Sequence, residues 1–190
     1  IDGLLASDPR IELRLNSAIW TDPNAELADL VVDVRDAAET DAGAPRLAPE
    51  QLVLAGAASM AEAFATTALQ DGIRRWRRIV IQGRNDLWQR WAAGMTIDLG
   101  SDVPVLKVDN AVMALEAAAQ GLGVTMAYST YCAPFIASGR VAAMPAARLQ
   151  TGLCFALTGT SDKPAWHPAH KVFDRLAEAF RAERAAPKPD

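Results

Sequence analysis

Short apolar runs alternate with amphipathic segments along most of the chain. The apolar runs are rich in Val, Ile and Leu and are too short for core helices, so they predict buried strands. Segments with apolar residues three or four positions apart predict helices between them. Strands that alternate with helices indicate an α/β fold with mainly parallel sheets. The predicted strands are 11–15, 30–34, 51–55, 79–81, 105–108, 124–126, 141–144 and 153–157, and the predicted helices begin near residues 1, 24, 59, 87, 110, 129 and 168.

The middle of the chain shows this alternation most clearly. Asp109 and Asn110 are predicted to cap a helix over 110–120, and Gly121 and Gly123 to close it with left-handed backbone before a buried strand. A strand, helix, strand unit of this kind points its carboxyl edge at a ligand. One face of the predicted helix carries Val112, Leu115, Ala119 and Leu122.

Three other segments carry specific expectations. Ser59 is predicted to cap the helix that follows it, and Pro134 is acceptable in its helix only within the first turn. The basic cluster 74–78, Arg-Arg-Trp-Arg-Arg, is interpreted as a solvated turn anchored by Trp76. A nucleic-acid contact is the alternative for this cluster, because basic residues beside an aromatic side chain are typical of such surfaces.

Composition narrows the class of partner. The chain has 190 residues, 51% of them hydrophobic, a formal net charge of −4 and a pI near 5.2. This acidity argues against a nucleic-acid-binding surface on the chain itself, since phosphate contacts need clustered Lys and Arg. A small metabolite is therefore the expected partner. The sequence has no apolar run long enough to span a membrane, so no membrane partner is predicted. Cys132 and Cys154 lack metal or redox spacing and are expected to be buried thiols in a reducing cytosol.

Motifs for catalysis or metal binding are missing from the sequence. Neither Gly-x-Ser-x-Gly nor Gly-x-x-x-x-Gly-Lys-Ser/Thr occurs, and Gly121-Leu122-Gly123 does not extend to the dinucleotide fingerprint because Met126 stands where glycine is needed. His167 and His170 lie three apart near the last helix, but no Cys or clustered carboxylate joins them as a metal ligand. We therefore expect no enzymatic activity, no cofactor and no metal site.

Polar residues gather just after the predicted strands. In open α/β sheets this edge is where ligands bind, which favours a binding cleft. The alternative is that Ser, Thr, Asn and Asp cap the following helices or turns without any ligand. The candidate ligand-binding residues are Asn16, Ser17, Arg35, Gln82, Thr125, Tyr128, Ser129 and Thr158.

Six segments follow one another in a characteristic order. They are DPRIELRL at 8–15, DLVV at 29–32, LVLA at 52–55, WQRW at 88–91, AAAQGLGV at 117–124 and ASGRV at 137–141. In this order the chain resembles the effector-binding domain of LysR-type transcriptional regulators, in the branch of the glycine-cleavage activator and the β-lactamase-inducer regulators. The resemblance covers nearly the whole chain, and it rests on order and spacing rather than on any single motif.

The resemblance implies a two-lobed fold like that of a periplasmic binding protein, with a small-molecule effector held between the lobes. The chain is expected to cross between lobes near Ala55–Ala57 and near Ala147–Thr151. Lobe I would then join 1–55 with 151–190, and lobe II would be 56–150. Such a chain would sense its effector and control DNA binding by a separate N-terminal winged helix-turn-helix domain, as a homodimer or tetramer in the cytoplasm.

The chain departs from the family pattern in two places. It begins at Ile1, within a helical pattern, without the DNA-binding domain or the first strand of lobe I, so a fragment with an incomplete site is expected. Where the family tends to have an Ile-Arg pair and a glycine after the strand at Leu30, Asp33 and Arg35 stand here. An acidic side chain there disfavours a carboxylate ligand nearby, unless Arg35 compensates.

Two other functions stay open at this point. A solute-binding protein of a transporter shares the two-lobed fold; an upstream secretion signal would favour it, and an upstream helix-turn-helix would exclude it. An enzyme is the third candidate, and the missing nucleophile motif counts against it.

Overall fold

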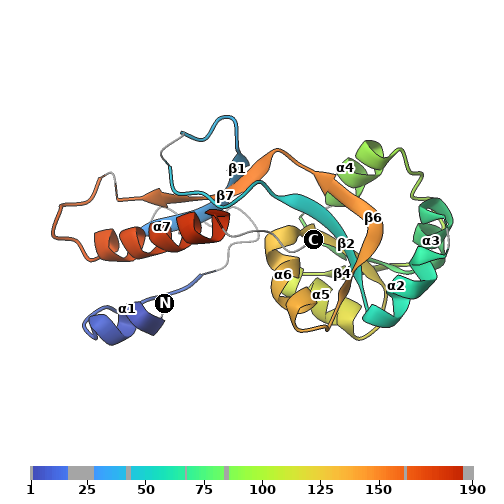
Figure 1. The fold of residues 1–190 in the computed structure, drawn as a ribbon, viewed down its shortest axis with the longest axis horizontal. Helices are drawn as coiled ribbons and strands as arrows, with labels where there is room; N and C mark the ends of the chain where they lie inside the picture. The colour runs from blue at the N-terminus through green and yellow to red at the C-terminus, as the bar shows by residue number, and fades with distance from the viewer. Residues whose placement is uncertain are drawn as a thin grey trace. The chain divides into compact units, whose positions relative to one another are not determined.

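The chain folds into two compact α/β units, in agreement with the predicted fold class (Figure 1). The first unit joins Ile1–Pro49 with Gly152–Asp190, and the second comprises Glu50–Thr151. Strand β2 (Gln51–Gly56) pairs with two strands of the second unit, so the first crossing precedes it instead of lying near Ala55. The computed structural model describes residues 2–16, 28–41, 44–66, 68–83, 86–160 and 162–185.

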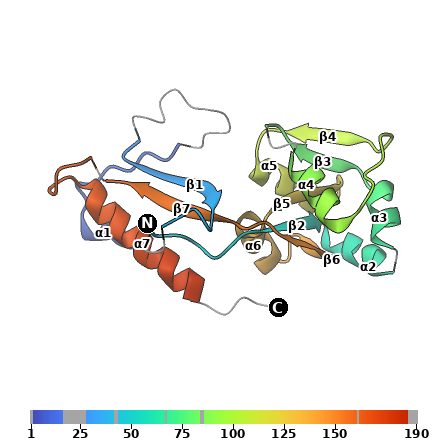
Figure 2. The ribbon, with the colours of Figure 1, turned by 90° about the horizontal axis from the view of Figure 1, so that it is seen from above.

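The first unit contains an antiparallel two-stranded sheet of β1 (Leu30–Asp36) and β7 (Leu153–Gly159). Helix α7 (Ala169–Ala185) runs beside this sheet (Figure 2). The sequence predicts a buried strand at 30–34, yet the residues of β1 are half-buried or exposed, and Val32 is 50% exposed. Helix α1 (Asp2–Ser7) opens the chain as predicted.

The second unit is built on a five-stranded sheet with the strand order β4-β3-β5-β2-β6. The remaining strands are β3 (Arg78–Ile81), β4 (Val105–Val108), β5 (Val124–Tyr128) and β6 (Ala142–Gln150). β3 runs parallel to β4 and β5, whereas β2 runs antiparallel to β5 and β6. The pairing is therefore mixed, not mainly parallel as predicted. The reason is that β2 enters and β6 leaves the unit at the same end, where Gln51 pairs with Gln150.

Five described helices of this unit pack on both sides of the sheet: α2 (Ala58–Ala65), α3 (Leu69–Arg75), α4 (Asp86–Met95), α5 (Ala111–Ala119) and α6 (Ser129–Ala137). Figure 1 shows α5 and α6 to the left of β2 and β6, and α2 and α3 to the right. The largest core side chain is Trp91 of α4, which is 0% exposed and donates from Nε1 to the Ala147 carbonyl at 2.9 Å. None of the described helices is long and apolar enough to cross a membrane.

Helix α5 begins where the sequence predicts. The Asn110 side chain accepts the backbone N–H of Met113 at 2.9 Å, which satisfies one donor of the first turn. The buried face of α5 shares Leu115 with the predicted face but otherwise differs from it. Val112 is 53% and Leu122 48% exposed, whereas Ala114, Leu115 and Ala118 are fully buried. Small side chains on the inner face let the helix approach the sheet closely.

Several local predictions were wrong. The strand predicted at 11–15 is not formed. The alternation of apolar and polar residues there is typical of a half-buried strand, but no described strand pairs with this segment. Helix α2 is capped at Ala57 without a side-chain hydrogen bond, so Ser59 is inside the helix. Pro134 lies in the interior of α6 and not in its first turn; it is exposed, and the helix ends soon after it at Ala137. The helix predicted from Asn24 to Leu30 lies mostly outside the described residues, and its last residue, Leu30, begins β1 instead.

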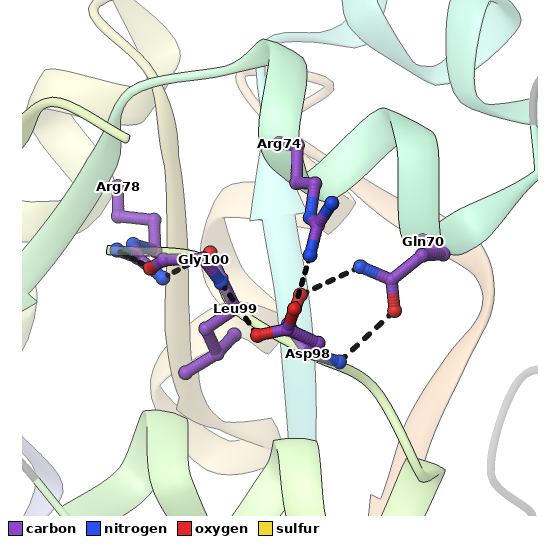
Figure 3. Close-up of polar contacts among 6 residues, drawn as sticks. All are labelled: Gln70, Arg74, Arg78, Asp98, Leu99 and Gly100. Atoms are coloured by element: carbon purple, nitrogen blue, oxygen red, sulfur yellow. Dashed lines mark hydrogen bonds and ion pairs between the residues drawn. The ribbon is translucent and has the colours of Figure 1, made fainter. Parts of the chain in front are cut away.

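The basic cluster 74–78 is solvated as predicted at Arg74, Arg75 and Arg77, with Trp76 half-buried between α3 and β3, but not at its last residue. Arg78 is the first residue of β3 and only 8% exposed. Its guanidinium donates to the carbonyls of Leu99 at 2.8 Å and Gly100 at 3.1 Å, so it fastens the loop after α4 to the sheet (Figure 3). Burial lowers the pKa of Arg78. The cluster therefore has a structural role at this residue.

Asp98 ties the same loop to α3. Its backbone N–H donates to the Gln70 side chain at 2.9 Å, and its carboxylate accepts the Gly100 N–H at 2.9 Å and pairs with Arg74 (Figure 3). The Gly100 N–H and then Arg74 lower the pKa of Asp98. The stability that the Asp98 carboxylate contributes is fully present above the pKa of an unfolded aspartate. It is lost as the pH falls toward the lowered pKa of the folded state.

Thr96, just after α4, has a left-handed backbone with φ 56°. The Ile97 N–H closes the helix on the Ala92 carbonyl at 2.9 Å, a geometry usually given to Gly or Asn. A β-branched residue there costs ~1–2 kcal/mol. We expect Thr96→Asn to raise the free energy of unfolding by about 0.5–1 kcal/mol in urea denaturation. Thr66→Asn is the control, since Thr66 has φ −101°; an equal gain there would contradict the strain.

Candidate functional site

The parallel strands of the second unit end at one common edge. β4, β3 and β5 run in the same direction, so the residues after them meet at the carboxyl edge of the sheet. Gln82 follows β3, Asn110 follows β4 and Ser129 follows β5. The N-termini of α5 and α6 begin at the same edge. Ligands of open α/β sheets bind at such an edge, because helix N-termini and loop N–H groups supply donors there.

Gln82 presents its side chain at this edge. It is exposed, and its backbone N–H donates to the Val108 carbonyl at 2.8 Å, which joins the ends of β3 and β4. Asn110 uses its side-chain oxygen to cap α5. The sequence left binding and capping as alternatives for such polar residues, and for Asn110 capping is what is observed.

Ser129 is held by a buried carboxylate, that of Glu50. Glu50 is 1% exposed, and its Oε2 accepts the Ser129 hydroxyl at 2.8 Å and the Thr130 N–H at 3.0 Å. The Thr130 hydroxyl donates to Oε1. The Ser129 hydroxyl in turn accepts the Gln51 N–H at 3.2 Å. Glu50 thereby caps α6 from a residue remote in sequence.

Glu50 also stands where the chain enters the second unit. Its backbone carbonyl accepts the Thr151 N–H at 3.2 Å and the Thr151 hydroxyl at 2.7 Å. Thr151 is the last residue before the chain leaves this unit. The incoming and outgoing segments are therefore bonded to each other, and through the Glu50 side chain to the N-terminus of α6.

Two other predicted binding residues of this unit are buried. Thr125 is 0% exposed, and its hydroxyl donates to the Ile79 carbonyl of the neighbouring strand at 3.3 Å. In this arrangement the Thr125 hydroxyl links β5 to β3. Tyr128 is 4% exposed and precedes α6.

The first unit carries the other candidates. The Arg35 guanidinium forms a two-bond ion pair with Asp33, at 2.8 Å to Oδ1 and 3.1 Å to Oδ2, which raises the pKa of Arg35. The negative charge of Asp33 therefore offsets the positive charge of Arg35. Asn16 is exposed, Thr158 is half-buried in β7, and Ser17 lies outside the described residues.

Histidine and cysteine side chains take structural positions. The His167 Nδ1 accepts the Ala169 N–H at 3.2 Å at the start of α7, and a His170 ring nitrogen lies 3.3 Å from the Lys163 carbonyl. In the described part of the chain, no cluster of three His, Cys, Asp or Glu residues is arranged to hold a metal. Both cysteines are buried and free, as predicted. Burial, and then the Glu50 charge, raise the pKa of Cys132 to about 12.

Glu50 is the residue that sequence reasoning missed. It lies just before the strand predicted from residue 51, and no periodicity marks it. The one signal in the sequence is that Glu50 stands two residues before the apolar run Leu52–Ala55. An acidic side chain so close to a buried strand must be either exposed to solvent or hydrogen-bonded.

Comparisons with known proteins agree with this architecture. The chain is similar to the effector domain of AmpR of Pseudomonas aeruginosa, with 21% identity, a TM-score of 0.71 and coverage of 96% of this chain and 87% of that one. It is similar to the regulatory domain of CrgA, a LysR-type regulator from Neisseria meningitidis, with 16% identity, a TM-score of 0.70 and coverage of 94% and 89%. Full-length LysG from Corynebacterium glutamicum, with bound effector Arg, gives 18% identity, a TM-score of 0.59 and coverage of 93% and 61%.

Sequence comparison gives the family itself. No curated protein sequence matches the chain significantly. The family model of the LysR substrate binding domain matches residues 1–181, which is nearly the whole chain. The expected resemblance is thereby confirmed, and it does not favour the solute-binding alternative. The chain belongs to the LysR substrate-binding domain family.

Proposed function

We propose that this chain is the effector-sensing regulatory domain of a LysR-type transcriptional regulator. It binds a small molecule and thereby controls DNA binding by a separate N-terminal domain. The observation that carries this proposal is the family match over residues 1–181. The bound effector of the LysG structure is consistent with it, as a property of that relative.

The proposed effector site uses the carboxyl edge of the second unit. We assign Gln82, Thr125, Tyr128 and Ser129 of this unit to the site. The first unit contributes Asn16, Ser17, Arg35 and Thr158 to the proposal. Their polar groups suit hydrogen bonding to a small metabolite.

Effector binding acts by shifting a conformational equilibrium. A ligand that binds one arrangement of the two units better than another raises the population of that arrangement. In a homodimer or tetramer this shift would change the spacing of the attached DNA-binding domains. A transcriptional regulator must reach chromosomal DNA, and we therefore propose that it is located in the cytoplasm.

A thermal-shift screen against metabolites and cell-wall fragments tests the sensor function. A ligand at a hundred times its dissociation constant stabilises the folded state by ~2.7 kcal/mol. For a chain of this size, that corresponds to a rise in Tm of about 5–10 °C. A flat response across a broad library, with the full-length regulator as well as this chain, would contradict the proposed function.

A further inference from the structure

Glu50 is a charged side chain buried as deeply as the apolar core, at 1% exposed. A buried carboxylate is costly unless donors surround it. Here three donors from two consecutive residues surround it: the Ser129 hydroxyl, the Thr130 N–H and the Thr130 hydroxyl. This donor set suits an ionised carboxylate, which accepts hydrogen bonds and donates none.

The partner of this carboxylate is the N-terminus of α6. The first N–H groups of a helix lack internal acceptors, and the helix dipole makes this end positive. The N-cap residue Tyr128 makes no side-chain capping bond. The anion that completes this helix end is Glu50, 80 residues away from Thr130 in the sequence. Helix N-termini at the carboxyl edge of an α/β sheet are where anionic ligand groups bind.

We propose that Glu50 determines effector specificity, because its carboxylate occupies the N-terminus of α6, where an anionic group of a ligand would otherwise bind. A ligand carboxylate or phosphate is kept from this helix end by occupancy and by like-charge repulsion. The effector therefore presents a neutral or cationic group, such as an amide or an amine, toward Ser129. Asp86 at the start of α4 and Asp109 before α5 add negative charge to the same edge. This inference rests on the proposed function, since it assigns the chemistry of that site.

The occupancy is tested without the effector, by chemical rescue of Glu50→Ala. The variant loses its carboxylate but keeps the three donors, so acetate is expected to bind in the vacated space. Sodium acetate should then raise its Tm more than equal sodium chloride does, while wild type and Glu62→Ala, an exposed α2 variant, respond equally to both salts. If Glu50→Ala folds poorly, the readout is recovery of folding in acetate but not in chloride. The absence of any acetate-specific effect would overturn the inference.

The selectivity is tested with matched ligand pairs that differ only by a carboxylate or its amide, such as glutamate with glutamine and aspartate with asparagine. In calorimetric titrations of wild type, the amide is expected to bind about tenfold tighter or more, and Glu50→Gln should narrow that ratio. Tighter binding of the carboxylate by wild type, or an unchanged ratio in Glu50→Gln, would overturn the inference. Binding of neither member counts against the proposed function instead, and the acetate rescue then decides the role of Glu50.

Discussion

Replacing Trp91 by alanine lowers the free energy of unfolding of the second unit by about 3–5 kcal/mol. Trp91 is 0% exposed, and its ring lies edge-on to Trp88 with the centroids 6.2 Å apart. Truncation leaves a cavity between α4 and the sheet. It also removes the donor to the Ala147 carbonyl of β6, a buried acceptor that would lose its partner.

Urea denaturation followed by far-ultraviolet circular dichroism measures this loss. Trp166→Ala is the matched control, because Trp166 is 80% exposed and its truncation should change the free energy of unfolding by less than about 0.5 kcal/mol. Equal effects of the two substitutions would show that the core is not packed around Trp91.

Gly123→Ala is expected to cost about 3 kcal/mol or more, for a backbone reason. Gly123 has φ 156°, and a Cβ placed there would lie 2.2 Å from the Arg77 carbonyl oxygen. That oxygen accepts the Val124 N–H at 2.9 Å, the bond that begins the pairing of β5 with β3. The added methyl group must therefore separate the two strands at their first contact.

Gly121→Ala separates the steric effect from the conformational one. Gly121 also has a positive φ, 74°, but nothing lies within 4 Å of a Cβ built on it. Its substitution should cost only the left-handed backbone penalty of ~1–2 kcal/mol. Thermal and urea unfolding of the two variants give the comparison, and a cost at Gly121 as large as that at Gly123 would be inconsistent with the clash.

The sequence predicts an element correctly where residues close together in the chain determine its structure. The cap at Asn110, the glycine stop at Gly121 and the apolar run from Val124 predict α5 and β5 correctly, because each feature acts within one or two helical turns. The family's order of segments then supplied the two-unit fold, which propensity alone does not specify.

The remainder depends on contacts between residues far apart in the sequence. The antiparallel pairing of β2 is set by where the chain enters and leaves the second unit, and periodicity carries no information about strand direction. Glu50 and Arg78 are buried because of partners on distant segments, Thr130 and Leu99, so both look like surface charges in the sequence. Thr125 is buried within β5, and its hydroxyl bonds the Ile79 carbonyl of a strand 46 residues away, a contact that the local sequence does not indicate.

Calorimetric titration of Gln82→Ala with the strongest ligand from the thermal-shift screen tests the proposed site most directly. Gln82 is exposed at the carboxyl edge, so its truncation should leave folding intact. Loss of one hydrogen bond to the effector should weaken binding by ~1–2 kcal/mol, which is about fivefold to thirtyfold in Kd. Gln89→Ala, an exposed glutamine on α4, should bind like wild type. Unchanged binding by Gln82→Ala would contradict an effector site at this edge.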